Sequence, residues 1–343
     1  MKKLLLSFSL TISYSLIMSM EAEIAIPTIS HIHQENLNKE LLKAVYADNT
    51  KLVQRLLYDG ANVNAENEYS NNKTPLMLAA ENKLSNMVQI LLSAGANVNH
   101  THKDKNTALI LATETIRNNP SSMFNTVKIL TNAGADVNAQ DKHGNTALMY
   151  TAFHYNYKAA QLLLDAGANI DLVNHNGDTA LMQSCQHNDE YGYNAAAIMF
   201  TIESRAEMVK ILIKAGANVN IANQQRQTPL MRALFNKNHP ETDLLIRAGA
   251  NVNDATKNGL TPLMIAAIKG YGHTINTLIE NDANINATDR GGYTALMIAA
   301  MHGSIPSIHN LIRNGADTTI RNNENKTALD LAQSQMIRQL LTK

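Results

Sequence analysis

The stretch Gly249-Ala250-Asn251-Val252-Asn253, followed eight residues later by Thr261-Pro262-Leu263-Met264, decides the fold of this chain. Close copies of both phrases recur along the sequence. The first phrase begins at Gly60, Gly95, Gly134, Gly167, Gly216, Gly249, Asp282 and Gly315. The second begins at Thr74, Thr107, Thr146, Thr179, Thr228, Thr261, Thr294 and Thr327. Two phrases that alternate at a fixed distance indicate one small structural unit repeated many times.

The spacing of the threonines gives the length of that unit. Successive threonines are separated by 33, 39, 33, 49, 33, 33 and 33 residues, so the period is 33 with insertions of six and sixteen residues. The shorter insertion lies near Arg117 to Ser122 and the longer one within His187 to Met208. The longer insertion is rich in helix formers and predicts a second helix about four turns longer than its neighbours, with Phe200 on a projecting end. It either forms a functional surface or only packs beside the next repeat.

The chemistry of each phrase predicts helix boundaries. Thr261 suits a helix N-cap and Pro262 the first helical position, where its missing N–H costs nothing. Gly249 ends a helix because it can adopt the left-handed conformation, and Asp282 tolerates that region better than most residues. Pairs such as Asn258-Gly259 favour a tight hairpin. Apolar residues three and four apart predict a second helix in each unit, as in Ile275, Leu278 and Ile279.

Helix, turn, helix and hairpin at a period of 33 resemble the ankyrin repeat family over residues 39–343. The resemblance implies an all-α ankyrin-repeat solenoid of about nine helix-turn-helix units linked by short hairpin loops. The units are expected near 39–64, 65–99, 100–138, 139–171, 172–220, 221–253, 254–286, 287–319 and 320–343.

One departure from the family is systematic. The family usually has His after Thr-Pro-Leu, and the hydrogen bonds that this His makes are therefore missing here. The position is occupied by Met77, Met149, Met182, Met231, Met264 and Met297, and otherwise by Ile110 and Asp330. Methionine side chains are flexible and pack well, so these residues are predicted to belong to the core.

The N-terminal residues resemble a targeting segment. Lys2-Lys3 precedes an apolar run from Leu4 to Met18, so residues 1–22 are interpreted as a signal peptide and 23–38 as a linker. An ordinary apolar helix is the alternative for the first stretch. We therefore expect an exported protein, either secreted, possibly into a host cell, or periplasmic. With its many Asn, Lys and Ile residues, the chain resembles exported ankyrin proteins of intracellular bacteria that bind host proteins; the alternative is a periplasmic scaffold for another envelope protein.

Composition limits the chemistry of the chain. The formal net charge is zero, aromatic residues make up 5% and Trp is absent, which argues against nucleic acid as a partner. The one cysteine, Cys185, cannot form an intramolecular disulfide and is interpreted as a core residue. His100 and His102 are expected at an exposed hairpin tip, with weak metal binding as an alternative. No catalytic or phosphate-binding motif is present, so we expect no enzyme activity, cofactor or metal site.

Partner-binding positions follow from the resemblance. The family commonly grips partners with hairpin tips and with exposed positions on the first helix of each unit, on the concave face. Those positions become apolar toward the C-terminus, and an exposed apolar row would mark a binding surface, although it could also be only packing. We expect a monomer, with no membrane span in the mature chain, that binds another protein. The candidate residues are Phe153, Phe200, Phe235, Leu260, Ile268, Tyr293 and Met301.

Overall fold

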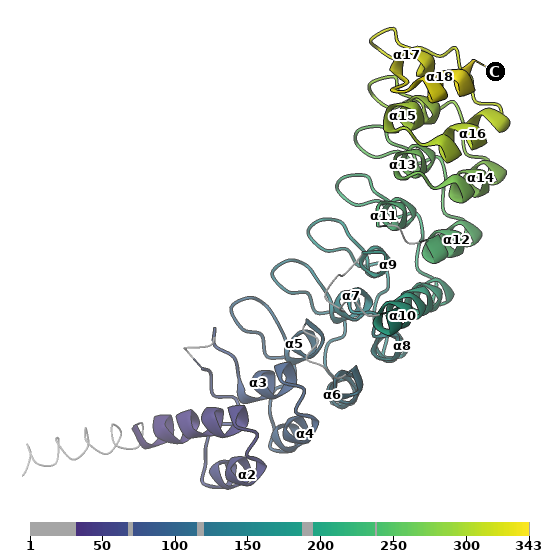
Figure 1. Cartoon of the computed structure of the whole chain (residues 1–343). Coiled ribbons are helices and arrows are strands. Elements are labelled where there is room, and N and C mark those ends of the chain that lie inside the picture. The colour runs from purple at the N-terminus through teal and green to yellow at the C-terminus, as the bar shows by residue number, and fades with distance from the viewer. Residues whose placement is uncertain (1–31, 68–70, 115–119, 187–194, 237–238, 343) are drawn as a thin grey trace, which may run out of the picture. The chain divides into compact units, whose positions relative to one another are not determined.

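The computed structural model describes residues 32–67, 71–114, 120–186, 195–236 and 239–342. The chain divides into two compact units, Met1–Ala135 and Asp136–Lys343. In both units, short helices occur in pairs and the pairs are joined by hairpin loops (Figure 1). The only β-type pairing among the described residues consists of two isolated bridges, Asn67 with Lys73 and Thr288 with Thr294. The predicted all-α repeat architecture is therefore confirmed.

The first described helix of the first unit covers residues 32–46 and pairs with the next helix in the chain. Its outer surface is charged and carries exposed ion pairs, Lys39 with Glu35 and Lys43 with Glu40. This polar surface closes one end of the apolar core, as the end of a solenoid requires. The remaining helices of the unit are α2 (Thr50–Tyr58), α3 (Pro75–Glu81), α4 (Ser85–Ser93), α5 (Ala108–Glu114) and α6 (Pro120–Asn132).

The second unit contains six helix pairs. Figure 1 shows its first helices in one column and its second helices in another, with the hairpins on the side of the first column. The first helices are α7 (Ala147–Phe153), α9 (Ala180–Ser184), α11 (Pro229–Phe235), α13 (Pro262–Lys269), α15 (Ala295–His302) and α17 (Ala328–Leu331). The second helices are α8 (Tyr157–Asp165), α10 (Ala195–Lys214), α12 (His239–Arg247), α14 (Gly272–Glu280), α16 (Ile305–Arg313) and α18 (Gln335–Leu341).

The threonines of the second phrase cap the first helices, as predicted. In α13, the hydroxyl of Thr261 accepts a hydrogen bond from the backbone N–H of Met264 at 3.3 Å. The same bond recurs at every described phrase, and Asp330 adds a reciprocal bond to the N–H of Thr327 that completes a capping box. Asp282 has φ of 66°, so it does occupy the left-handed conformation that glycine adopts in the other units.

The methionines that replace histidine form part of the core. All six are at most 2% exposed, and each lies on the first helix of its repeat. Their packing explains why the stack holds without the histidine hydrogen bonds of the family.

A ladder of asparagine side chains connects successive repeats, and we refer to it as the Asn ladder. The Oδ1 atom of Asn253 accepts from the backbone N–H of Asn284 at 2.7 Å, and its Nδ2 atom donates to the carbonyl of Asp282 at 2.9 Å. Asn220 makes the equivalent two bonds to Asn251 and Gly249. The final Asn of the first phrase therefore links repeats as well as following a helix end. The acceptors of the ladder are Asn64, Asn138, Asp171, Asn220, Asn253 and Asn286.

Two local expectations differ from the structure. The first described helix covers residues 32–46, so it includes the last residues of the stretch interpreted as a linker, and Asn38 within it accepts from the N–H of Asn62 at 2.8 Å. The insertion does lengthen α10 to 20 residues against nine in α8, but this is about three extra turns rather than four. The rest of the insertion, residues 187–194, lies outside the described residues.

Candidate partner-binding groove

Each hairpin of the second unit is built on one inward-facing polar side chain. Asn174 is 8% exposed, and its Oδ1 atom accepts from the N–H groups of Asn176 and Asp178 at 2.9 and 3.0 Å. Because these bonds satisfy the backbone of the tip, the hairpins are fixed as ledges beside the first helices. The same role is played by Asp141, Asn223, Thr256, Asp289 and Asn322.

Neighbouring tips are joined by their main chains. The N–H of His175 donates to the carbonyl of His143 at 2.8 Å, and the N–H of Arg290 donates to that of Asn258 at 3.2 Å. Gly259, with φ of 85°, permits this approach: a Cβ atom there would lie 2.8 Å from the nitrogen of Arg290. The tips of the second unit therefore form one continuous row.

The surface between the hairpins and the first helices of the second unit is called the groove below. Its layers of residues 141–232, called the polar layers, carry a hydrogen-bonded network between hairpins and first helices. The hydroxyl of Tyr150 donates to Asp141 at 2.7 Å. In the next layers, Asp178 is 5% exposed at its side chain and accepts from Arg232 at 2.6 Å and from Asn223 at 2.8 Å. The charge of Asp178 is thus balanced inside the groove.

A hollow of about 310 Å³ opens in these polar layers. Its wall includes the aromatic residues Tyr150 and Phe153 on α7 together with the amides of Gln183 and Gln186. The ring of Phe153 meets that of His154 edge to face, with centroids 5.1 Å apart. The hollow is large enough for a side chain of a partner, with amides at hand to bond its main chain.

The layers of residues 256–301, called the apolar layers, present hydrophobic side chains at the equivalent positions. Leu260 stands where Asp178 stands in the polar layers, one residue before the capping threonine. Ile268 and Met301 lie at the C-terminal ends of α13 and α15. Together with Phe235 and Tyr293 they form what we call the apolar row, and each of the five residues is half-buried. The row keeps part of its apolar surface in contact with water, but none of its members is fully exposed.

The ring of Tyr293 has a defined place in this row. Its hydroxyl donates to Glu324 of the following hairpin at 3.5 Å. Gly291 makes room for the ring, because an added Cβ atom would lie 2.8 Å from Cδ2 of Tyr293. Phe153, also half-buried, belongs to the polar hollow rather than to the apolar row. Phe200 lies within the bounds of α10, but its side chain is outside the described part of the chain.

A buried polar cluster lies behind the groove, where the insertion enters. Arg205 on α10 and Glu241 on α12 form an ion pair at 3.4 Å, with their side chains 8% and 0% exposed. The guanidinium also lies 6.0 Å from the ring centroid of Tyr155. Burial raises the pKa of the Glu241 carboxyl, and the charge of Arg205 only partly offsets this effect. Sequence reasoning missed this pair, although the signal was present. At the position of Glu241, the second helices α4, α6, α8, α10, α14 and α16 have Met87, Thr126, Ala159, Met208, Thr274 and Ser307.

Cys185 borders this cluster as a buried thiol. It is 0% exposed, and burial together with the charge of Glu241 raises its pKa to about 12. The thiol is therefore protonated at neutral pH and out of contact with solvent. This environment fits the core role predicted for Cys185 and is unsuited to a nucleophile.

The histidines of the first unit differ from expectation in one respect. His100 is half-buried and lies 3.3 Å from Glu66, whereas His102 is 6% exposed. His102 is buried because its Nδ1 atom accepts from the N–H of Asp104 at 3.0 Å, which is the hairpin role that Asn174 has in the second unit. Within the described ranges, no group of three or more His, Cys, Asp or Glu residues is placed to hold a metal ion.

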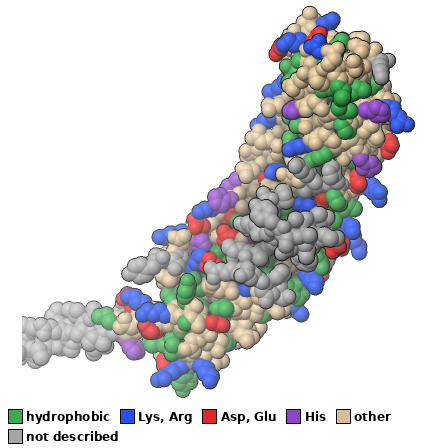
Figure 2. All heavy atoms as spheres, viewed as in Figure 1, with side chains coloured by type: hydrophobic (Ala, Val, Ile, Leu, Met, Phe, Trp, Pro, Cys, Tyr) green, Lys and Arg blue, Asp and Glu red, His purple; other side chains and the backbone are tan. Residues whose placement is uncertain are grey.

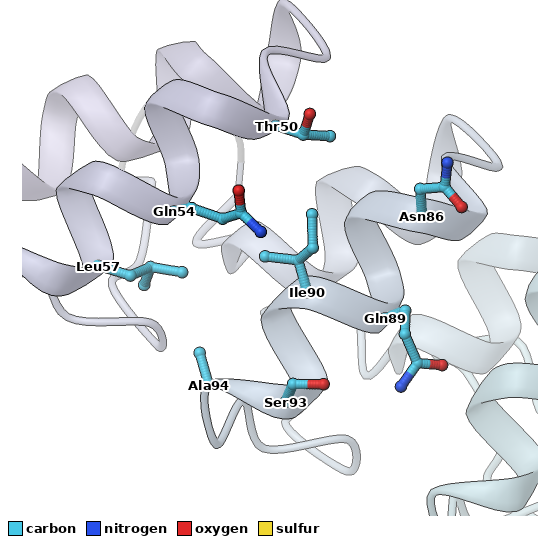
Figure 3. Close-up of a pocket in the computed structure, with 8 residues that line it drawn as sticks. All are labelled: Thr50, Gln54, Leu57, Asn86, Gln89, Ile90, Ser93 and Ala94. Carbon is cyan, nitrogen blue, oxygen red and sulfur yellow. The ribbon is translucent and has the colours of Figure 1, made fainter.

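A second hollow lies in the first unit, between the second helices α2 and α4 (Figure 3). It measures about 610 Å³, and its lining carries no charged side chain. Leu57 and Ile90 supply its apolar surface and Gln54 and Gln89 its amides.

None of the helices that the structure describes is long and apolar enough to cross a membrane.

Comparison with known proteins agrees with this architecture. Ankyrin repeats in the three-copy form match residues 41–123, 119–198 and 194–289, and the many-copy form matches residues 278–332. The mitochondrial disaggregase of Homo sapiens is 45% identical over 64 residues, which are 19% of this chain and 9% of that protein. The chain thus matches only a small part of that relative, about two repeat periods long.

Stacked helix pairs joined by a row of hairpin loops place this chain among the solenoid repeat proteins, which use extended surfaces to bind other proteins. The chain belongs to the ankyrin repeat family, whose matches extend from residue 41 to residue 332. Ankyrin repeats act as protein-protein interaction modules, and they imply a protein as the partner of this chain.

Proposed function

We propose that this chain is a non-catalytic binding module that captures a partner protein in the groove of its second unit. The observation that supports this most directly is the change in the groove from hydrogen-bonded polar layers to the apolar row. Half-buried Ile268 and Met301 expose hydrophobic surface that the fold does not need for its caps or hairpins. A fixed groove with apolar and polar parts suits an extended or helical segment of another protein.

The proposal is tested by truncating two members of the apolar row in the full chain. The variant with Phe235→Ala and Met301→Ala is compared with the wild type in affinity capture followed by mass spectrometry. The control carries Tyr46→Ala and Tyr58→Ala, which remove aromatic side chains that are 76% and 91% exposed in the first unit. We expect capture of the specific partner to be lost only in the apolar-row variant. Loss of capture in both variants, or in neither, would contradict the proposal.

We further propose that the protein is exported and acts on a protein outside the cytoplasm of the producing cell. The support is the charged and then apolar start of the sequence, from Lys2 to Met18. Fractionation of cells that produce the full chain, with sequencing of the N-terminus of the recovered protein, tests this. A protein that stays in the cytoplasm and keeps Met1 would contradict export, whereas retention in the periplasm would favour a scaffold for an envelope protein over a host-directed role.

A further inference from the structure

The hairpin tips of the second unit separate charge by sign. Their basic and imidazole side chains point outward: Lys142, His143, His175, Arg226, Lys257 and Arg290 are all exposed. Among the described residues 141–293, no Asp or Glu side chain at a tip is exposed. Figure 2 shows Lys, Arg and His side chains along the edge of the molecule that carries these hairpins.

The carboxylates of the same hairpins are engaged inside. Asp141 accepts from Tyr150, and Asp178 pairs with Arg232. Asp289 accepts from the N–H groups of Gly291 and Tyr293, both at 2.8 Å.

Two carboxylates limit the row of cations. Asp254, half-buried, accepts from Asn251 at 2.9 Å and attracts Arg226, so that tip is the most nearly balanced. The hairpin after the tip of Arg290 ends the pattern, because its exposed Glu324 pairs with Lys326 at 2.8 Å. The outward charge of the tips between residues 142 and 290 is therefore positive although the chain as a whole is neutral.

We infer that this row of tips binds an acidic, extended segment of the partner protein. Successive tips are one repeat apart, and neighbouring helices in such stacks lie about 10 Å apart. An extended chain advances about 3.3 Å per residue, so one carboxylate at every third position would meet one tip per repeat. A protein segment is favoured over nucleic acid because no tip between residues 142 and 290 offers more than one lysine or arginine, and the groove beside the tips is lined by amides and apolar side chains.

This inference rests on the proposed function but concerns a different surface from the apolar row. The probe is a fluorescent peptide of about five Gly-Ser-Glu repeats, one for each tip between residues 142 and 290. Its binding to the full chain is measured by fluorescence anisotropy at about 50 mM salt, where exposed charges are weakly screened. A peptide of the same composition with its glutamates gathered at one end and a single-stranded DNA of equal charge serve as comparison ligands.

The tip variant carries Arg226→Gln, Lys257→Gln and Arg290→Gln. The matched control carries Lys158→Gln, Arg247→Gln and Arg313→Gln, which remove the same charge from exposed positions on α8, α12 and α16. We expect the tip variant to weaken peptide binding about tenfold and the control to change it less than about twofold, because exposed ion pairs contribute modestly and locally. Thermal unfolding of both variants followed by circular dichroism confirms that they are folded.

Four outcomes would overturn the inference. Equal weakening by the control variant would show that only net charge matters. Equal binding of the clustered peptide would remove the match to repeat spacing, and DNA binding as tight as that of the spaced peptide would point to nucleic acid instead. If the tip variant still captures the partner protein while the apolar-row variant does not, the proposed function stands and this inference fails.

Discussion

The polar layers and the apolar layers of the second unit share one backbone plan but fill the groove differently. Where Asp178 precedes its capping threonine and binds Arg232, the apolar layers have Leu260 and, at the position of Arg232, Ile265. Ile265 is buried at 0% exposure, whereas Arg232 is 18% exposed at its side chain. The repeat thus specifies the frame and leaves the groove side chains free to vary, so function is encoded in the layers and not in the repeat itself.

The largest expected effect is the loss of one partner of the polar layers. Asp178→Ala removes the carboxylate that accepts from the half-buried guanidinium of Arg232, and leaves the amide of Asn223 only its longer bond to Gln227 at 3.4 Å. We expect it to lower the free energy of unfolding by about 2–4 kcal/mol. Urea unfolding followed by circular dichroism measures the change. The matched double variant Asp178→Leu with Arg232→Ile copies the apolar layers, and it should recover most of the loss. A double variant less stable than Asp178→Ala would show that the two kinds of layer are not interchangeable.

The free energy of unfolding should depend on pH through Glu241, which is particular to one repeat. The equivalent position in other repeats holds a small or apolar residue. Its folded-state pKa is raised above the unfolded value, so folding favours the protonated carboxyl. Wild type should therefore lose stability relative to Glu241→Gln as pH rises from acidic values, below the unfolded pKa, toward neutrality. Urea titrations of both proteins at several pH values test the sign. A difference that grows in favour of wild type would mean that attraction to Arg205 outweighs the cost of burial.

The Asn ladder should respond equally in both regions, since it belongs to the shared frame. Asn220→Ala in the polar layers and Asn253→Ala directly before the apolar layers each remove two inter-repeat hydrogen bonds. We expect each to lower the free energy of unfolding by about 1 kcal/mol, because the positions are exposed and water replaces part of the lost bonding. Parallel chemical unfolding curves give the comparison. A cost confined to one variant would show that the groove residues also determine how tightly the repeats stack.

The smallest effect should come from repairing the ladder. Asp171 accepts from the N–H of Asn218 at 3.0 Å, but its carboxylate cannot supply the donor that Asn220 and Asn253 use. Asp171→Asn restores that donor toward the carbonyl of Gly216, and we expect a gain of about 0.5 kcal/mol. Thermal unfolding against wild type measures it. Unchanged or lower stability would indicate that the sixteen-residue insertion between these repeats alters the local stacking geometry.

Sequence reasoning reached the repeat frame because its determinants are local. Capping by Thr261 and the left-handed conformation of Asp282 each depend on residues within one period, and the structure confirms them. The candidate groove was only partly accessible. The apolar row followed from position within the repeat, but its half-burial depends on neighbouring layers. The sequence indicated Asn253 only as part of a helix-ending phrase. Its role between repeats was missed because its bonds to Asn284 and Asp282 span a whole repeat.

By itself, the sequence determined the family, the number and period of the repeats and the place of the longer helix α10, because short-range capping and hydrophobic spacing specify them. The tertiary structure alone decided which polar side chains meet. The pairing of Asp178 with Arg232 and of Arg205 with Glu241 joins different repeats, as does the row of cationic tips. Such contacts depend on how one repeat stacks on the next, and that geometry is a property of the packed layers rather than of any single period.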